Sequence, residues 1–209
     1  MLKGLFGTKI GMTQIFDENR NVIPVTVVGI GDWFVTQVKT KQNEGYSAVQ
    51  IGLLKKRYKD KAFSQEWLRL KNKFFACVRE VEIDEAVEKD FSVGKEVKIE
   101  QFALKENEEV AISGTSKSLG FQGVVKRWGF GGGPKAHGST FHRAPGSIGC
   151  MATQGNVMKG QKLPGRCGGK RVTMKGLHVV RIDQEGKNLF VKGAVPGKKD
   201  SLLFIRRQG

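Results

Sequence analysis

Cysteine is scarce in this 209-residue sequence, and long apolar runs are absent. The three cysteines, Cys77, Cys150 and Cys167, are widely spaced and form no CxxC pair. They support neither a disulfide framework nor a cysteine zinc site, and they fit reduced thiols in the cytoplasm. No stretch approaches the roughly 18 consecutive apolar residues of a membrane span, and the N-terminus is too interrupted by glycine and lysine for a signal peptide. We expect a soluble cytoplasmic protein with no membrane partner.

Acidic residues are missing from residues 110–182, a stretch of 73 residues that contains 12 lysines and arginines. Residues 1–109 contain 18 basic and 17 acidic residues, so the acid-free stretch carries most of the formal net charge of +16. A solvated surface normally mixes both signs, and this imbalance indicates a polyanionic partner. The stretch is also rich in glycine and cannot bury enough apolar surface for a core of its own. We interpret it as an extended loop that becomes ordered on its partner.

Nucleotide-binding and catalytic motifs are also missing. The P-loop pattern fails because Pro164 replaces its first glycine and Arg171 replaces its serine or threonine. The dinucleotide pattern fails because Pro134 replaces its third glycine. His137 and His142 lie where no acidic residue can orient either ring. We therefore expect no cofactor, no metal, no catalytic residue and no small-molecule substrate.

Short β-branched or alternating runs, bounded by turn-forming residues, predict a mainly β fold. The predicted strands are residues 9–16, 22–30, 33–40, 46–54 and 95–102, the end of 106–116, and then 171–183, 188–196 and 202–206. Their spacing favours a barrel or a sandwich, with Pro24 at an edge or a bulge.

Two segments between these strands are expected to differ. Phe63, Trp67, Leu70 and Phe74 have helical spacing, which predicts one short amphipathic helix between residues 55 and 79. The acidic residues 80–92 are expected to form a solvated turn and helix.

We divide the chain accordingly. Residues 1–125 form the first part of a β-barrel domain, with a helical insertion at about 55–92. Residues 126–170 form an extended segment, here called the arm, and residues 171–209 supply strands that complete the barrel. A compact β domain interrupted in this way places both ends of the loop close together on one face.

Basic and aromatic residues in and near the arm are candidate contacts to RNA. Lysine and arginine bind phosphate oxygens, aromatic rings stack on exposed bases, and glycines allow the backbone a close approach. The predicted RNA-binding residues are Lys117, Lys126, Arg127, Trp128, Lys135, His137, Phe141, His142, Arg143, Lys159, Lys162, Arg166, Lys170, Arg171 and Lys175, with Phe130 as a further stacking candidate.

Other interpretations stay open on the residues alone. One is an RNA-processing or RNA-modifying enzyme that uses His137 and His142, and another is a nonspecific DNA-binding protein. A merely soluble basic loop does not explain why 73 consecutive residues lack a carboxylate.

Several collinear motifs identify the sequence as similar to a known family. It resembles the bacterial form of the large-subunit ribosomal protein L-three family in the segments GLFGTKIGMTQIFDENRNVIPVTVV, GYSAVQIG, GFQGVVKRWGF, HGSTFHRAPGSIG, RVTMKGLHVVRID and NLFVKGAVPG. The likeness covers essentially the whole chain.

The resemblance implies a structural constituent of the large ribosomal subunit and not an enzyme. It implies a translation-factor-like β-barrel on the outside of the subunit, with an extension that runs through ribosomal RNA toward the peptidyl transferase centre. Such a protein binds near the 3′ end of 23S rRNA, nucleates assembly, and neighbours the L-fourteen and L-nineteen proteins. Residues 128–133 would begin the extension. The residues toward its inner end, which would pack and neutralise phosphates, would be His142, Arg143, Pro145, Gly146, Ser147 and Ile148.

One position departs from the family pattern. Some bacterial members carry, directly after GSIG, a glutamine that is methylated on its side-chain amide, whereas this sequence has Cys150 there. A thiol offers no amide, so we expect this modification to be absent at Cys150.

Overall fold

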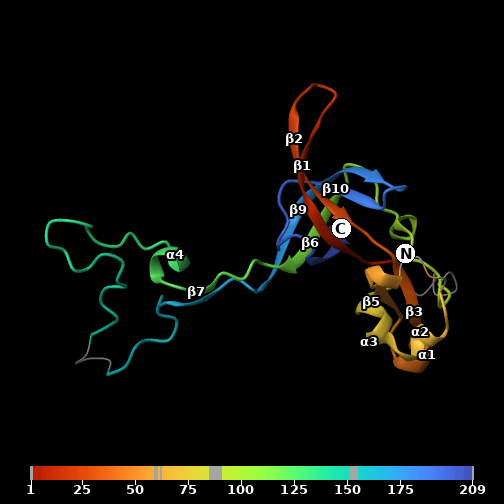
Figure 1. The fold of residues 1–209 in the computed structure, drawn as a ribbon, viewed down its shortest axis with the longest axis horizontal. Helices are drawn as coiled ribbons and strands as arrows, with labels where there is room; N and C mark the ends of the chain where they lie inside the picture. Colours follow the sequence, from red (N-terminus) through yellow and green to blue (C-terminus); the bar gives the residue numbers. More distant parts are fainter. Residues whose placement is uncertain (1, 59–60, 62, 85–90, 151–154, 209) are drawn as a thin grey trace. The chain divides into compact units, whose positions relative to one another are not determined.

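The computed structural model describes residues 2–58, 61, 63–84, 91–150 and 155–208. Contacts within the chain divide it into two compact units (Figure 1). Residues 1–115 and 171–209 form the first, here called the sheet unit, and residues 116–170 form the second, here called the inserted unit. The inserted unit therefore begins ten residues before the expected start of the arm.

Six strands of the sheet unit form a sheet that closes on itself within the described residues. These strands are β1 (Leu5–Phe16), β2 (Val22–Gly29), β6 (Glu109–Thr115), β9 (Arg171–Asp183), β10 (Asn188–Lys192) and β11 (Leu202–Arg207). Their order is β1-β11-β6-β9-β10-β2, and β1 also pairs with β2. All six pairs are antiparallel. The prediction of a mainly β chain is confirmed.

Branched apolar side chains from these strands fill the interior of the closed sheet. Val28, Ile112, Leu189, Leu203 and Ile205 are fully buried and belong to one continuous core. Burying each such side chain stabilises the fold by about 1.5–3 kcal/mol relative to leaving it exposed. The strands of the closed sheet therefore supply a core of their own.

A second, three-stranded sheet belongs to the same core. It consists of β3 (Trp33–Lys39), β4 (Ala48–Leu54) and β5 (Phe75–Glu82) in that order. Helix α1 (Lys41–Glu44) connects β3 to β4. Trp33 is fully buried, and its ring lies 5.6 Å from that of Phe6 on β1, so the two sheets pack together.

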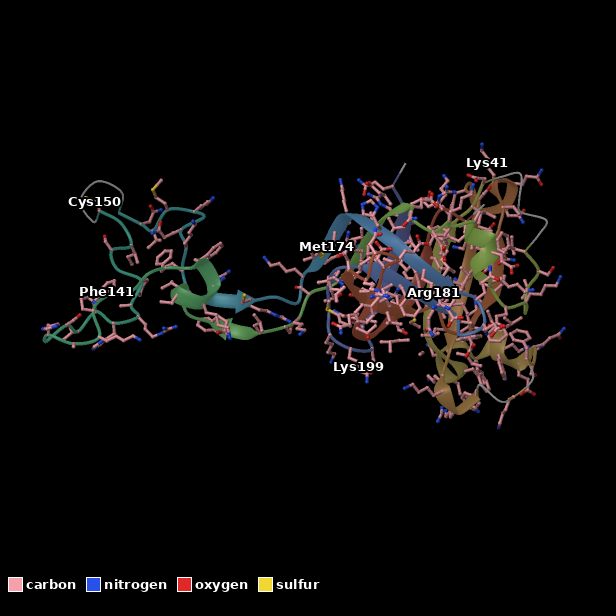
Figure 2. The ribbon with its side chains drawn as sticks, turned by 90° about the horizontal axis from the view of Figure 1, so that it is seen from above. Lys41, Phe141, Cys150, Met174, Arg181 and Lys199 are labelled. Atoms are coloured by element: carbon pink, nitrogen blue, oxygen red, sulfur yellow. The ribbon has the colours of Figure 1, made fainter. Side chains whose placement is uncertain are left out.

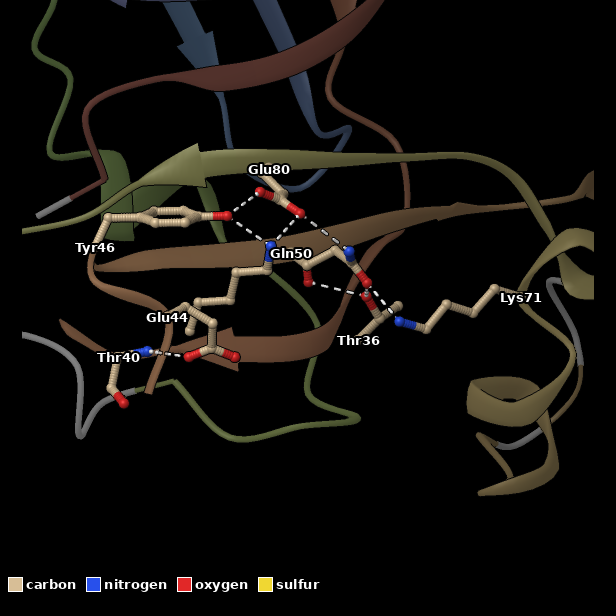
Figure 3. A network of polar contacts seen from close by, with 8 residues as sticks. Thr36, Thr40, Glu44, Tyr46, Gln50, Lys71 and Glu80 are labelled. Atoms are coloured by element: carbon tan, nitrogen blue, oxygen red, sulfur yellow. Dashed lines mark hydrogen bonds and ion pairs between the residues drawn. The ribbon is translucent and has the colours of Figure 1, made fainter. Parts of the chain in front are cut away.

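A polar network covers one side of this second sheet (Figure 3). Lys39 lies 2.8 Å from the carboxylate of Glu80 and donates a hydrogen bond to the hydroxyl of Tyr46. The Tyr46 hydroxyl and the Gln50 amide both donate to Glu80. The hydrogen bond from Lys39 lowers the pKa of Glu80, and the reciprocal contact raises the pKa of Lys39. The network ties β3, β4 and β5 side by side.

The single amphipathic helix predicted between residues 55 and 79 is wrong. The segment contains a 3-10 turn (Lys56–Tyr58) and two four-residue helices, α2 (Glu66–Arg69) and α3 (Lys71–Phe74), before β5 begins. Leu70 separates the two helices and is 54% exposed, so it is not part of the apolar face. Trp67 and Phe74 are buried in a small aromatic cluster instead.

The segments around residues 80–102 also differ from expectation. Strand β5 continues to Glu82, so the start of the acidic segment is a strand, while residues 85–90 lie outside the described residues. The predicted strand over residues 95–102 is wrong, because a 3-10 helix spans Ile99–Phe102. Ile99 and Phe102, at the two ends of that helix, are both buried and lie three residues apart. This spacing favours a turn of helix over an alternating strand.

The inserted unit leaves and re-enters the sheet unit at paired positions. Strand β6 ends at Thr115, β9 begins at Arg171, and these two residues are partners in the ladder. The prediction that both ends of the interrupting loop lie close together is confirmed.

Candidate nucleic-acid interface

The two ends of the inserted unit are held together by backbone pairing. Strands β7 (Gly120–Gln122) and β8 (Gly165–Cys167) form an antiparallel pair. The amide of Ser116 also donates to the carbonyl of Lys170 at 2.9 Å. The 55-residue insertion is therefore a loop with a paired base.

Glycine is required in this base. Gly168 has a φ of +74°, and a Cβ there would overlap the carbonyl oxygen of Lys117 on the opposite side of the base. A larger residue would push the two sides apart, because backbone atoms cannot move aside as a flexible side chain can.

A short helix places two side chains over the base. Helix α4 (Val124–Trp128) ends at Gly129, whose φ is +76°. Arg127 Nη1 donates to the carbonyl oxygen of Leu163 at 2.7 Å, and Trp128 Nε1 donates to the same oxygen at 3.0 Å. The guanidinium of Arg127 also lies 4.9 Å from the centre of the Trp128 ring. We call this arrangement the Arg127–Trp128 clasp.

Beyond the clasp, no described residue between 129 and 162 lies in a helix or strand. One backbone contact folds the segment back, from the amide of Gly133 to the carbonyl of His142 at 2.7 Å. Phe141 and Cys150 lie on this segment and are labelled in Figure 2. Both residues are exposed.

The structure places nearly all predicted RNA-binding residues at the surface. Arg127 is half-buried in the clasp, and the others are exposed. Those in the inserted unit are Lys117, Lys126, Trp128, Lys135, His137, Phe141, His142, Arg143, Lys159, Lys162, Arg166 and Lys170. Arg171 and Lys175 lie on β9 in the sheet unit. Phe130 is half-buried.

The charge of the inserted unit has no counterpart within it. The segment contains no aspartate or glutamate, so none of its cations forms an ion pair inside the unit. Lys162 Nζ lies 5.9 Å from the centre of the Trp128 ring, a weak cation–π contact. The exposed cations are therefore available to the phosphates of a polyanion.

The two histidines do not assemble a reactive site. His137 and His142 are both exposed and have φ values of +60° and +43°. Across the described part of the chain, no three His, Cys, Asp or Glu side chains gather where they could hold a metal ion. Neither ring has a carboxylate in its own unit to orient it.

Two features of the interface were not predicted from the sequence. Phe121 on β7 is 77% exposed, the most exposed large apolar residue among those described. The sequence does carry a signal for Phe121, because it is a lone aromatic residue flanked by Gly120 and Gly123 in a segment without acidic residues. The clasp gave no signal, because Arg127 and Leu163 are 36 residues apart.

A family model and full-length relatives of known identity agree on one family for this chain. The family model described as Ribosomal protein L3 matches residues 77–189. A large ribosomal subunit protein uL3 of Geotalea daltonii is 46% identical over 209 residues, covering 99% of this chain and 97% of the relative. The uL3 proteins of Dehalococcoides mccartyi strains BAV1 and CBDB1 are each 43% identical over 210 residues and cover 100% of both chains. The chain belongs to the ribosomal protein L3 family.

Membership in the L3 family makes the chain a structural protein of the large ribosomal subunit, so it resides in the ribosome in the cytoplasm. The L3 family is not a known enzyme family. Among the described residues, no helix has the length and apolar character that crossing a membrane requires.

Proposed function

We propose that this L3-family chain is a primary 23S rRNA-binding protein that binds near the 3′ end of the RNA and nucleates assembly of the large subunit. The observation that carries the proposal is the inserted unit, whose lysines and arginines are nearly all exposed and which contains no carboxylate. RNA phosphates would supply the negative partners that the unit lacks.

The mechanism is electrostatic and structural. Where RNA segments converge, their phosphates repel each other, and cations placed between them replace that repulsion with attraction. The paired base and the clasp fix the start of the loop, so that fewer residues lose conformational freedom on binding. Trp128 and Phe141 are partly exposed and offer faces for unpaired bases.

We further propose where the two parts of the chain lie in the large subunit. The sheet unit is of the translation-factor-like β-barrel kind and lies on the outside of the subunit. The arm extends toward the peptidyl transferase centre, and the L-fourteen and L-nineteen proteins are neighbours. These parts rest on the family likeness and on the division of the chain into a nearly neutral portion and an acid-free one.

Crosslinking followed by RNA sequencing, combined with sedimentation of the tagged protein, tests the proposal. We expect reads concentrated near the 3′ end of 23S rRNA, from protein in the large-subunit peak. Reads spread over many transcripts, with protein at the top of the gradient, would overturn it.

A charge-matched pair of variants tests the role of the inserted unit. One replaces Lys135, Arg143 and Lys159 by Gln, and the control replaces Lys56, Lys95 and Lys105 in the sheet unit by Gln. If each arm cation neutralises one phosphate, the first variant lowers the steepness of the salt dependence by about 3, since each contact contributes about 0.9. Equal effects of the two variants would show that the inserted unit is not the main contact.

A further inference from the structure

The hairpin of β1 and β2 continues past the rest of its sheet. Strand β11 pairs with β1 only as far as Thr8, and β10 pairs with β2 only as far as Val25. β1 and β2 remain paired to each other out to Phe16 and Val22. Figure 1 shows this hairpin projecting from the closed sheet. Pro24 lies just past the last residue of β2 that pairs with β10, and its carbonyl accepts a hydrogen bond from the amide of Gly193 at 2.8 Å. The expectation of an edge or a bulge at Pro24 stays a prediction.

One face of the projecting hairpin carries exposed apolar side chains toward its tip, with Gln14 as a polar member among them and Thr26 buried at its base. The register sets Phe16 opposite Val22, Gln14 opposite Pro24 and Met12 opposite Thr26, and alternate residues of a strand share a face. Phe16 is 68% exposed, and Met12 and Val22 are each 53% exposed. A two-stranded hairpin without a packed face is marginally stable in water, and a contiguous exposed apolar patch marks an interaction surface.

The charge of the hairpin disfavours a phosphate backbone as its occupant. Residues 10–24 contain only three charged residues, Asp17, Glu18 and Arg20, so the segment is net negative in a chain of net charge +16. Binding to nucleic acid depends on cations that displace counterions from phosphates. The two acids at the tip instead complement lysine or arginine on a partner.

We propose that the β1–β2 hairpin is a docking surface for another protein of the large subunit, which presents an apolar patch bordered by basic residues. The apolar face covers the patch, and Asp17 and Glu18 pair with the basic border. Pro24 lacks an N–H and its carbonyl already accepts from the amide of Gly193, so a partner strand does not add to β2 there, and the contact is made through the face. This inference rests on the position in the large subunit and is independent of the RNA contacts proposed for the inserted unit.

A photoreactive benzophenone amino acid at position 16 tests the docking surface. The full-length tagged chain is expressed in cells, large subunits are isolated and irradiated, and the crosslinked products are identified. The same group at the exposed position 121 in the inserted unit is the matched control. We expect position 16 to yield a crosslink to one ribosomal protein, within an apolar surface that carries lysine or arginine. A crosslink to RNA, or none while position 121 reacts, would overturn the inference.

A substitution provides a second test. Phe16→Ser should lower the affinity of the purified chain for the identified partner about tenfold, as expected for removal of an aromatic anchor. Leu70→Ser is the matched control, because Leu70 is 54% exposed and lies far from the hairpin in sequence. Both residues are largely exposed, so both variants should fold, which thermal unfolding verifies. Equal affinities of Phe16→Ser and the unmodified chain would contradict the proposed surface.

Discussion

Replacing Arg127 by alanine should loosen the base of the inserted unit. In the clasp, the Arg127 guanidinium donates to the carbonyl of Leu163 at 2.7 Å and lies 4.9 Å from the centre of the Trp128 ring. It also covers Gly165 on β8, where an added Cβ would overlap the guanidinium. The substitution removes all three contacts and leaves the backbone pairing of β7 and β8 in place.

The expected magnitude follows from the burial of the group. A hydrogen bond from a charged donor is worth about 1.5–3 kcal/mol when buried. Arg127 is only half-buried, and Trp128 Nε1 still donates to the same oxygen in the variant. We therefore expect a loss of about 1 kcal/mol, which raises the population of the open base about fivefold.

Hydrogen exchange on the free full-length protein measures this opening. The amides of residues 119–122 and 165–167 should exchange about fivefold faster in Arg127→Ala. Lys126→Ala is the matched control, because Lys126 is its exposed neighbour and a candidate phosphate contact. That variant should leave exchange unchanged and reduce the salt slope of RNA binding by about 1. If Arg127→Ala instead changed the salt slope and left exchange unaltered, the clasp would have no structural role.

Three further predictions concern other parts of the chain. Lys187 lies 3.0 Å from Asp32 and also pairs with Glu96, and the hydrogen bond to Glu96 raises its pKa. Lys187→Met should therefore cost about 0.5–1 kcal/mol in urea unfolding at pH 8, and the difference should vanish as the pH rises through the elevated pKa, because the stabilising charge is lost there. Limited proteolysis of the free protein should cut first between residues 129 and 162, beyond the clasp, and cuts in the sheet unit first would contradict the arm interpretation. Mass analysis of the peptide that contains Cys150 from isolated ribosomes should show no methyl group, since a thiol has no amide to modify.

The strands of the closed sheet could be predicted because local pattern and tertiary environment agree there. Residues 22–30 and 202–206 are rich in branched apolar residues and end at turn-forming ones. The structure buries Leu203 and Ile205 at alternate positions of β11, and it buries Val25, Thr26 and Val28 of β2 without strict alternation. A short run of branched apolar residues therefore indicates a strand here even where the period of two is imperfect.

The region between β4 and β6 could not be predicted in the same way. The spacing of Phe63, Trp67, Leu70 and Phe74 fits a helix, yet Leu70 is exposed and Phe75 begins a strand. Pairing of Phe75 with Leu54 on β4 decides the outcome, and that partner lies 21 residues earlier in the chain. Tertiary pairing therefore overrides a local helical pattern of only three intervals.

In the candidate interface, too, some features could be predicted from the sequence and others could not. Its charge and exposure follow from composition, because a segment with many cations and no carboxylate has no internal partner for them. Its internal contacts do not follow, since the Leu163 carbonyl that receives two side-chain donors is a backbone group that any residue could supply.

The absence of carboxylates and the paired base both help to leave the cations of the inserted unit available to a polyanion. An acidic residue within the inserted unit would pair with a nearby cation in the free protein, and that pair would have to break before the cation met a phosphate. Without one, each cation of the unit meets only other cations within the unit. The base limits the cost of repulsion between them, because Thr115 and Arg171 are already adjacent in the ladder and the clasp joins α4 to Leu163. The loop is thus held at its ends by the β7–β8 backbone pairing and by the Arg127 and Trp128 side chains, and its exposed cations remain available for a polyanion.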